Sequence, residues 1–280
     1  MFYIKHLMGI SMVALLVTAC NNESKPAKEA EAMSTSASPA LKEENVSYQA
    51  DGATLNSYVV YDDADKSKRP AVLVMPEWWG MNEYTKRRAR ELAKLGYVAI
   101  AVDIFGNGKV ADNPDSAKAF SGPFYADPQK SKARIDATIA KIRSYPQVDS
   151  SKIGAIGYCF GGGMLLNTIR LGDDLKAVVS FHGSLIGTPA RKDLLKTSIL
   201  VCHGNDDKFV TPADVAAFKK QMDSIGADYK FIGYDGATHA FTNPQSTENG
   251  KKFNMPIAYN AAADTASWKA MQDFFNAKLK

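Results

Sequence analysis

A cysteine stands at the centre of a glycine-rich turn in the middle of the chain. Residues 157–161 read G-Y-C-F-G, after an apolar run at 153–156 and before a predicted helix at 160–171. This is the spacing of a nucleophile elbow, a strand-to-helix turn so sharp that small residues must flank the nucleophile two positions away. The start of a helix also favours a thiolate. Cys159 is therefore a candidate nucleophile, and the alternative is an inert buried cysteine in a turn.

A thiol nucleophile needs a histidine base and a carboxylate that orients the histidine. On sheets with this type of elbow, the chain order is nucleophile, acid, histidine. The segment after the apolar run 198–202 supplies two candidate acids, Asp206 and Asp207. His239 is the only histidine farther along the chain. The sequence therefore offers Cys159, one of two aspartates, and His239 in the required order.

The other histidines have simpler interpretations. His182 follows the apolar run 177–181 and could line the site, but a hydrogen-bonded structural histidine is the plainer interpretation. His203 is expected to anchor the turn that bears the aspartates. No spacing of His, Cys, Asp and Glu indicates a metal site, and no phosphate-binding or dinucleotide-binding motif is present, so we expect no cofactor.

Apolar strands alternate with helical segments from about residue 45 to the end of the chain. This pattern predicts one α/β domain with a mostly parallel central sheet and helices on both faces. The expected strands are 56–61, 71–75, 97–102, 153–157, 177–181, 198–202 and 229–234, the expected helices are 82–95, 128–144, 160–171, 212–225 and 258–278, and 106–128 is expected to be a loop. Ligands of such sheets bind beyond the carboxyl ends of the strands. The residues at those ends are Glu77, Asp103, Cys159, His182, His203, Asp207 and His239.

The beginning of the chain has a different composition. Residues 1–19 contain an apolar stretch too short to span a bilayer well, and residues 16–20, L-V-T-A-C, resemble a bacterial lipobox. We expect a signal peptide at 1–19, a lipid on Cys20, and a disordered tether over 20–45, which is polar and free of aromatic residues before Tyr48. An ordinary cleaved signal or an uncleaved anchor is the alternative.

Lipidation at this position implies a location in the cell envelope. If the source has two membranes, the absence of an aspartate after Cys20 implies the periplasmic face of the outer membrane. The net charge is only +4, and the densest basic run, 86–90, is expected on the solvated face of a helix. A nucleic-acid partner is therefore not expected.

Four motifs, in the same order, resemble those of the dienelactone hydrolase family of α/β hydrolases. They are P-E-W-W-G at 76–80, G-Y-C-F-G-G at 157–162, G-N-D-D at 204–207 and T-H-A-F at 238–241. The resemblance covers about residues 46–280. It implies that the acid is Asp207 rather than Asp206, and that Glu77 contacts the cysteine and helps to generate the thiolate when substrate arrives.

The resemblance implies a hydrolase of carboxylic esters or lactones that works through a thioester acyl-enzyme. Cys159 attacks the carbonyl, and His239, held by Asp207, protonates the leaving group and then activates water. The backbone N–H groups of Phe160 and Trp78 are expected to bind the oxyanion. Small esters or lactones are the expected partners, the expected state is monomeric, and the expected pocket residues are Trp79, Phe241 and His182.

One departure from the family pattern concerns the substrate. In family members that cleave dienelactone, an arginine a few residues after the histidine binds the substrate carboxylate. Here the stretch after His239 continues through Phe241, Thr242 and Asn243 without an arginine. The natural substrate therefore need not be dienelactone. The alternative function is a non-catalytic envelope lipoprotein that uses the hydrolase fold as a binding module.

Overall fold

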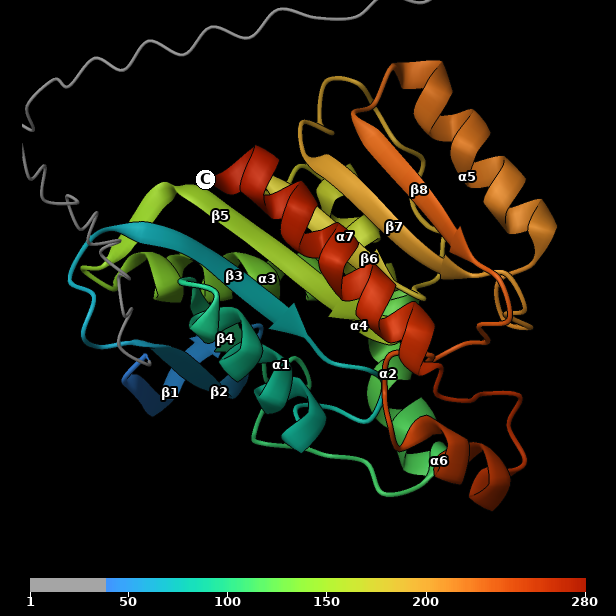
Figure 1. Cartoon of the computed structure of the whole chain (residues 1–280), viewed down its shortest axis with the longest axis horizontal. Helices are drawn as coiled ribbons and strands as arrows, with labels where there is room; N and C mark the ends of the chain where they lie inside the picture. Colours follow the sequence, from blue (N-terminus) through green and yellow to red (C-terminus); the bar gives the residue numbers. More distant parts are fainter. Residues whose placement is uncertain (1–38) are drawn as a thin grey trace, which may run out of the picture. The chain divides into compact units, whose positions relative to one another are not determined.

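An eight-stranded sheet organises residues 39–280, the part of the chain that the computed structural model describes (Figure 1). The strands are β1 (Leu41–Ala50), β2 (Ala53–Asp62), β3 (Arg69–Met75), β4 (Val98–Ala101), β5 (Val148–Tyr158), β6 (Ala177–Phe181), β7 (Ser198–Gly204) and β8 (Tyr229–Tyr234). The helices are α1 (Glu83–Lys94), α2 (Pro114–Ala126), α3 (Pro128–Arg143), α4 (Phe160–Arg170), α5 (Pro212–Ile225), α6 (Ser246–Phe253) and α7 (Ala261–Leu279).

The order of strands across the sheet is β1-β2-β4-β3-β5-β6-β7-β8. β1 pairs with β2 and β2 with β4 in antiparallel fashion, and every pairing from β4 to β8 is parallel. The carboxyl ends of β3, β5, β6, β7 and β8 therefore meet at one edge of the sheet, where ligands of parallel sheets bind.

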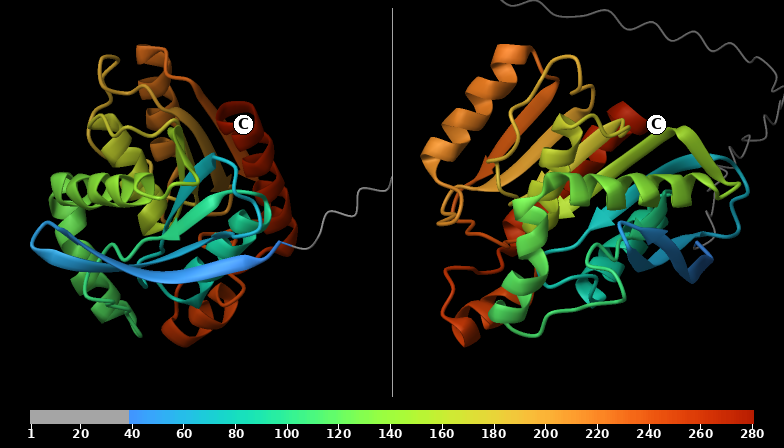
Figure 2. Two further views of the ribbon diagram at one scale, coloured as in Figure 1. Left: turned by 90° about the vertical axis from the view of Figure 1, so that its left-hand side faces the viewer. Right: turned by 180° about the vertical axis from the view of Figure 1, so that it is seen from behind.

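Helices cover both faces of the sheet (Figure 2). Side chains of α3, α4 and α5 form one apolar layer with the sheet, and side chains of α1 and α7 form the other. Successive residues of β5 alternate between the layers, since Ala155 packs in the first and Ile156 in the second. This alternation explains why the strand is apolar throughout: both of its faces are buried.

The predicted fold class is confirmed: one α/β domain carries a mostly parallel sheet with helices on both faces. The strands predicted at 177–181 and 229–234 and the helix predicted at 212–225 have the predicted bounds. The other predicted strands and helices are present, with ends that differ by a few residues. Apolar periodicity was sufficient for these elements because each buries a continuous stripe or face.

Two helices were missed. The predicted loop at 106–128 contains α2, and the segment after His239 contains α6. The Asn and Pro residues that indicated a loop are the start of α2: Asn113 caps the helix through the N–H groups of Asp115 and Ser116, and Pro114 occupies the first helical position. Proline is favoured there because the N–H that it lacks has no intrahelical partner.

The predicted tether, 20–45, extends too far along the chain. Residues 41–45 belong to β1, whose side chains alternate between half-buried and exposed. In the described part of the chain, β1 is an edge strand that pairs only with β2, so its outer edge and one face remain polar. The composition of residues 41–45 therefore resembles that of a solvated tether. The signal peptide, the lipid site at Cys20 and residues 21–38 of the tether lie outside the described residues. Between residues 39 and 280, no helix has the length and apolar character needed to cross a membrane.

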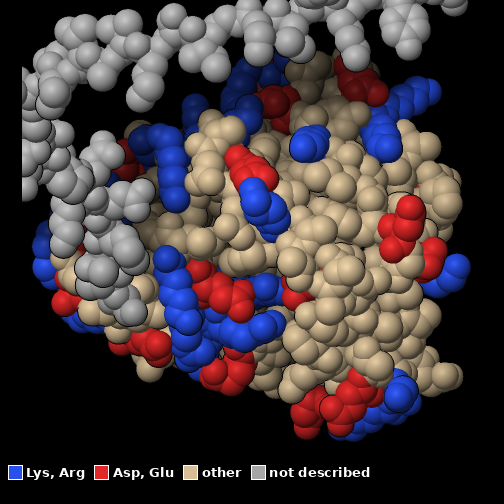
Figure 3. Space-filling view, in the orientation of Figure 1, with Lys and Arg blue, Asp and Glu red and all other residues tan. Residues whose placement is uncertain are grey.

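The basic run at 86–90 lies on α1, and its charges are paired. Lys86 contacts Glu83 at 3.2 Å, Arg87 contacts Glu91 at 3.5 Å, and Arg90 contacts Glu43 at 3.1 Å. Acidic and basic side chains are intermixed over this region of the surface (Figure 3). Arg88 differs from its neighbours because it points inward and is buried.

The turn between β5 and α4 is the most constrained point of the fold. Cys159 adopts φ 50° and ψ −115°, a conformation that side-chain-bearing residues rarely adopt. A Cβ at Gly157 would lie 2.5 Å from the backbone of Gly161, and a Cβ at Gly161 would lie 2.5 Å from the carbonyl oxygen of Pro76. Both glycines are therefore required sterically for the elbow.

We predict that Gly161→Ala destabilises the protein. The added methyl group meets backbone atoms, which cannot move aside without shifting β3 or α4, so the expected loss is about 1–3 kcal/mol of unfolding free energy. Gly122→Ala is the matched control, because Gly122 is also helical but has open space around its Cβ position. It should be neutral or stabilising by about 0.5–1 kcal/mol. Urea unfolding measures both, and equal effects of the two substitutions would contradict the steric argument.

Candidate active site

Three loops at the carboxyl edge of the sheet bring a thiol, an imidazole and a carboxylate into line. Sγ of Cys159 lies 3.0 Å from Nε2 of His239, and Nδ1 of His239 lies 2.8 Å from Oδ2 of Asp207. Cys159 stands between β5 and α4, Asp207 follows β7, and His239 follows β8. The geometry is that of a nucleophile, a base and a group that orients the base.

The structure separates the two candidate acids. Asp207 is buried, and its Oδ1 accepts hydrogen bonds from the N–H groups of Phe209 at 2.7 Å and Val210 at 3.2 Å. Asp206 is exposed. Burial favours the neutral acid, but the hydrogen bonds from His239 and the backbone outweigh burial and hold the pKa of Asp207 below its usual value. Asp207 is therefore the carboxylate that contacts the histidine, and it carries its charge at neutral pH.

His239 is placed to hold a proton between two partners. Burial by itself lowers the pKa of an imidazole, but the Cys159 sulfur and the Asp207 carboxylate outweigh it and raise the pKa of His239 to about 10. The loop that carries His239 is held in place by a short parallel bridge to Ile257. The imidazole can therefore accept the thiol proton and keep it near the sulfur.

Glu77 also lies at this edge of the sheet, and its hydrogen bond is to Asn243. The carboxylate is buried, and its Oε2 accepts a hydrogen bond from Nδ2 of Asn243 at 2.7 Å. Burial raises the pKa of Glu77 to about 7, despite the opposing effects of Asn243 and the His239 charge. Within residues 39–280, Glu77 has no hydrogen bond to Cys159, although both side chains line the same cavity.

Two backbone N–H groups beside the sulfur are free. Phe160 is the first residue of α4, where backbone N–H groups have no intrahelical acceptor. Trp78 lies in the loop after β3, which contacts the elbow through a hydrogen bond from Gly161 N–H to the Pro76 carbonyl. Among the described residues, neither the Phe160 N–H nor the Trp78 N–H has an acceptor. Both N–H groups are therefore available to a ligand, as the predicted oxyanion donors must be.

A cavity of about 760 Å³ opens over the sulfur, which is a volume suited to a small organic molecule. Its wall is largely aromatic and aliphatic. Trp79 lines it, as predicted, and stacks at tilted angles against Trp78 and Phe253. The remaining lining residues come mainly from α2 and from the segment that follows α6. Neither helix was predicted from the sequence. These lining residues include Lys118, Ser121, Tyr125, Met255, Pro256 and Ile257.

Phe241 and His182 do not line this cavity, so their assignment to the substrate pocket is corrected. Phe241 is fully buried behind the catalytic loop and packs against His182 and Tyr234. It follows Ala240, whose φ of 57° reverses the chain direction and turns the next side chain into the core.

His182 supports the elbow from below. Its Nδ1 accepts a hydrogen bond from the Cys159 N–H at 3.1 Å, and its Nε2 lies 2.8 Å from Oγ1 of Thr242. Burial and the neighbouring His239 charge hold the pKa of His182 well below its usual value. The ring is therefore neutral, with its proton on Nε2 and directed at Thr242.

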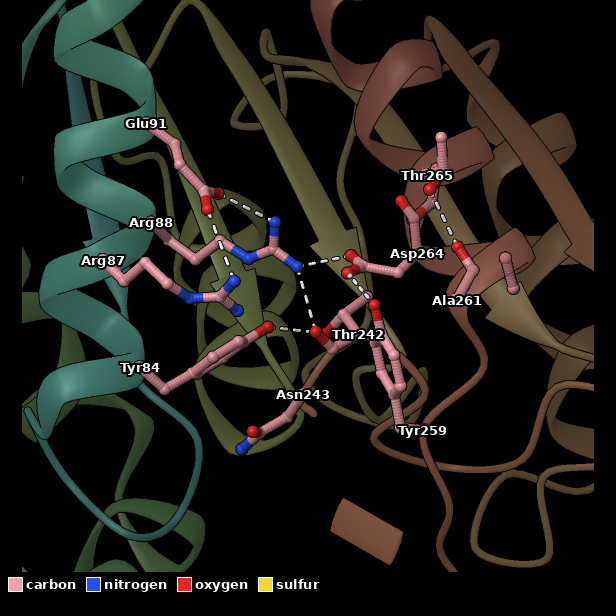
Figure 4. Close-up of polar contacts among 12 residues, drawn as sticks. Tyr84, Arg87, Arg88, Glu91, Thr242, Asn243, Tyr259, Ala261, Asp264 and Thr265 are labelled. Atoms are coloured by element: carbon pink, nitrogen blue, oxygen red, sulfur yellow. Dashed lines mark hydrogen bonds and ion pairs between the residues drawn. The ribbon is translucent and has the colours of Figure 1, made fainter. Parts of the chain in front are cut away.

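Thr242 connects this support to α1 and α7, a set of contacts that the sequence did not indicate (Figure 4). Its hydroxyl lies 2.7 Å from the Tyr84 hydroxyl, and its carbonyl accepts from Arg88 at 2.9 Å. Arg88 also forms an ion pair with Asp264. The available signal was the spacing: Tyr84 and Arg88 are four residues apart on α1, on the face that carries the buried Leu92.

No group of His, Cys, Asp and Glu in residues 39–280 has an arrangement that could hold a metal ion. His203 is buried and packs against Phe231, in keeping with a structural role. Asp103 accepts hydrogen bonds from the N–H groups of Asn56, Gly106 and Gly108, so it shapes the loop after β4.

Comparison with known proteins agrees with this geometry. Residues 55–279 match the sequence model of the dienelactone hydrolase family. A solved dienelactone hydrolase-like promiscuous phosphotriesterase from metagenomic libraries is 32% identical, with a TM-score of 0.80, over 86% of this chain and 99% of that one. Protein usf of Aquifex pyrophilus is 30% identical over 203 residues, which cover 71% of this chain and 86% of that protein.

A more distant structure shares the fold. The dienelactone hydrolase of Anabaena variabilis is 17% identical, with a TM-score of 0.61, over 86% of this chain and 99% of that one. The family match spans nearly the whole described domain and includes the elbow, the acid and the histidine. The chain is therefore a hydrolase that belongs to the dienelactone hydrolase family.

Proposed function

We propose that the protein hydrolyses carboxylic esters or lactones, with Cys159 as the nucleophile. The observation that carries the proposal is the continuous contact from Cys159 through His239 to Asp207, which opens onto a cavity beside two free backbone N–H groups. This arrangement contains each group that acyl transfer requires: a nucleophile, a base, an orienting carboxylate and donors for the oxyanion.

The first half of the reaction forms a thioester. Sγ of Cys159, its proton transferred to Nε2 of His239, attacks the carbonyl carbon of the substrate. The C=O π electrons move to the carbonyl oxygen, which accepts hydrogen bonds from the N–H groups of Phe160 and Trp78. The oxyanion then re-forms the carbonyl and expels the alkoxide, which takes the proton from His239.

The second half releases the acid. His239 accepts a proton from a water molecule, and the resulting hydroxide attacks the thioester carbonyl. The same N–H groups hold the second oxyanion, which collapses and expels the Cys159 thiolate. Asp207 remains ionised throughout and stabilises the imidazolium that forms in each half.

Glu77 assists the thiol in this proposal. Its carboxylate is buried within the cavity that holds Cys159, and a single amide hydrogen bond from Asn243 leaves its other oxygen free of hydrogen bonds among the described residues. When substrate enters, the ionised carboxylate stabilises the imidazolium of His239, which holds the proton taken from the thiol.

We further propose that Cys20 is lipidated and that residues 21–38 connect it to the domain, which places the enzyme at the cell envelope. The support is the lipobox-like string L-V-T-A-C at residues 16–20 and the polar composition that follows it.

Replacing the nucleophile should abolish hydrolysis. We expect Cys159→Ala to lower kcat/KM for 4-nitrophenyl acetate and for a small lactone by at least about 10⁴-fold, because removing a nucleophile removes the covalent path. Cys202→Ala is the matched control. Cys202 is buried in β7, and burial raises its pKa to about 12, so that variant should retain activity. Full activity in Cys159→Ala would refute the assignment.

The pH profile should report Glu77. Because its pKa is raised to about 7 and its ionised form assists the thiol, kcat/KM should rise as the pH increases through about 7. The pKa of His239 lies at about 10, so its titration falls outside this range. Glu77→Gln keeps the shape and the bond to Asn243 but should lower kcat/KM about 10²-fold and remove this inflection. An unchanged profile in the variant would show that another group titrates.

Lipidation is tested by fractionation. Cys20→Ser removes the atom that would carry the lipid, so the protein should move from the membrane fraction to the soluble fraction. Cys202→Ser controls for the loss of a thiol elsewhere. Membrane association that persists in Cys20→Ser would contradict the lipobox interpretation.

A further inference from the structure

The buried end of the active-site cavity holds more negative than positive charge. Among the described lining residues, the acidic and basic side chains are Glu77, His239 and Lys118, beside the Cys159 thiol and the Tyr125 phenol. His239 is already paired with Asp207, so one imidazolium faces two carboxylates. Lys118 is exposed on α2 and forms no ion pair with any described residue. Among the described lining residues, the cations are therefore the imidazolium, which is already paired, and this exposed lysine.

The partner of Glu77 is neutral. Asn243 holds the carboxylate through one amide hydrogen bond of 2.7 Å. The guanidinium of the buried Arg88 is already occupied, because it pairs with Asp264 and Glu91 and donates to the Thr242 carbonyl (Figure 4). Arg88 is also absent from the cavity lining. Among the described lining residues, a second anion placed beside Glu77 would therefore find no buried, unpaired cation.

The walls and the mouth of the cavity are apolar. Trp78, Trp79 and Phe253 form an aromatic wall, and their ring centroids lie 5.0 and 5.8 Å apart in succession. At the mouth, Tyr125 and Phe209 are about half exposed, at 52% and 54%, although large hydrophobic side chains are usually buried. Such surfaces stabilise an apolar group by removing it from water.

From these observations we propose that the enzyme selects substrates whose acyl group is uncharged and apolar, and that Glu77 with its neutral partner Asn243 excludes acyl groups that bear a carboxylate. The inference rests on the proposed ester hydrolysis. The acyl group is the relevant part because it stays bound to Cys159 after the alcohol has left, so the cavity must accommodate it through both halves of the reaction. A carboxylate there loses its hydration beside a second anion.

The test uses two esters that differ in one charge. The first is the 4-nitrophenyl half-ester of adipic acid, and the second is the same molecule with its free carboxylate capped as a methyl ester. Release of 4-nitrophenolate is followed at pH 8 with the full-length protein in detergent, after subtraction of uncatalysed hydrolysis. We expect kcat/KM to be at least about tenfold higher for the capped ester, since an unpaired carboxylate is costly to desolvate.

Two variants test which residue causes the difference in kcat/KM between the two esters. Glu77→Gln removes the negative charge and should reduce the ratio between the two esters, even though its overall activity is lower, because both substrates share the catalytic loss. Lys118→Ala tests the exposed lysine of the lining, and the preference for the capped ester should persist in it, because the exclusion is assigned to Glu77.

The outcomes separate this inference from the proposed function. Hydrolysis of both esters with equal or greater kcat/KM for the charged one overturns the inference and leaves ester hydrolysis standing. A preference for the charged ester that disappears in Lys118→Ala would show that the cavity binds anions through that lysine. Hydrolysis of neither ester, by a protein that unfolds cooperatively, overturns the proposed function and this inference with it.

Discussion

The site depends on the close approach between the end of β3 and the start of α4. The N–H of Gly161 donates to the carbonyl of Pro76 over 3.0 Å, and no Cβ fits between the two segments. Because Glu77 and Trp78 directly follow Pro76, this contact brings a carboxylate and a free backbone donor to the thiol of Cys159. Two elements that lie about eighty residues apart thus form one wall of the site.

Residues 239–243 contact three groups of the site at once. His239 contacts the thiol, Thr242 accepts a hydrogen bond from His182, and Asn243 donates a hydrogen bond to Glu77. His182 in turn accepts a hydrogen bond from the Cys159 N–H. Residues 239–243 therefore contact the sulfur through His239 and support the strained turn at Cys159 through Thr242 and His182. The contacts of Thr242 with α1 anchor this segment to the apolar layer on that face of the sheet.

Much of the fold and part of the site could be predicted from local patterns. The parallel strands are apolar because both faces are covered, and the elbow has small residues because its backbone atoms are in contact. β1 and α2 were missed because β1 is half exposed and the cap of α2 consists of the residues that also make turns. The half of the cavity wall that comes from α2 and from the end of α6 and the segment after it could therefore not be predicted from the sequence.

The sequence by itself determined the order of most strands and helices, the place of Cys159 in a strand-to-helix turn, and the histidine and aspartates available to it, because each follows from local spacing. Only the tertiary structure decided that Phe241 faces the core, that His182 lies beneath the elbow, and that Glu77 binds Asn243. The reason is geometric. These residues lie in loops at the strand ends, where His182 and Ala240 have positive φ, side chains no longer alternate as in a strand, and partners come from distant segments.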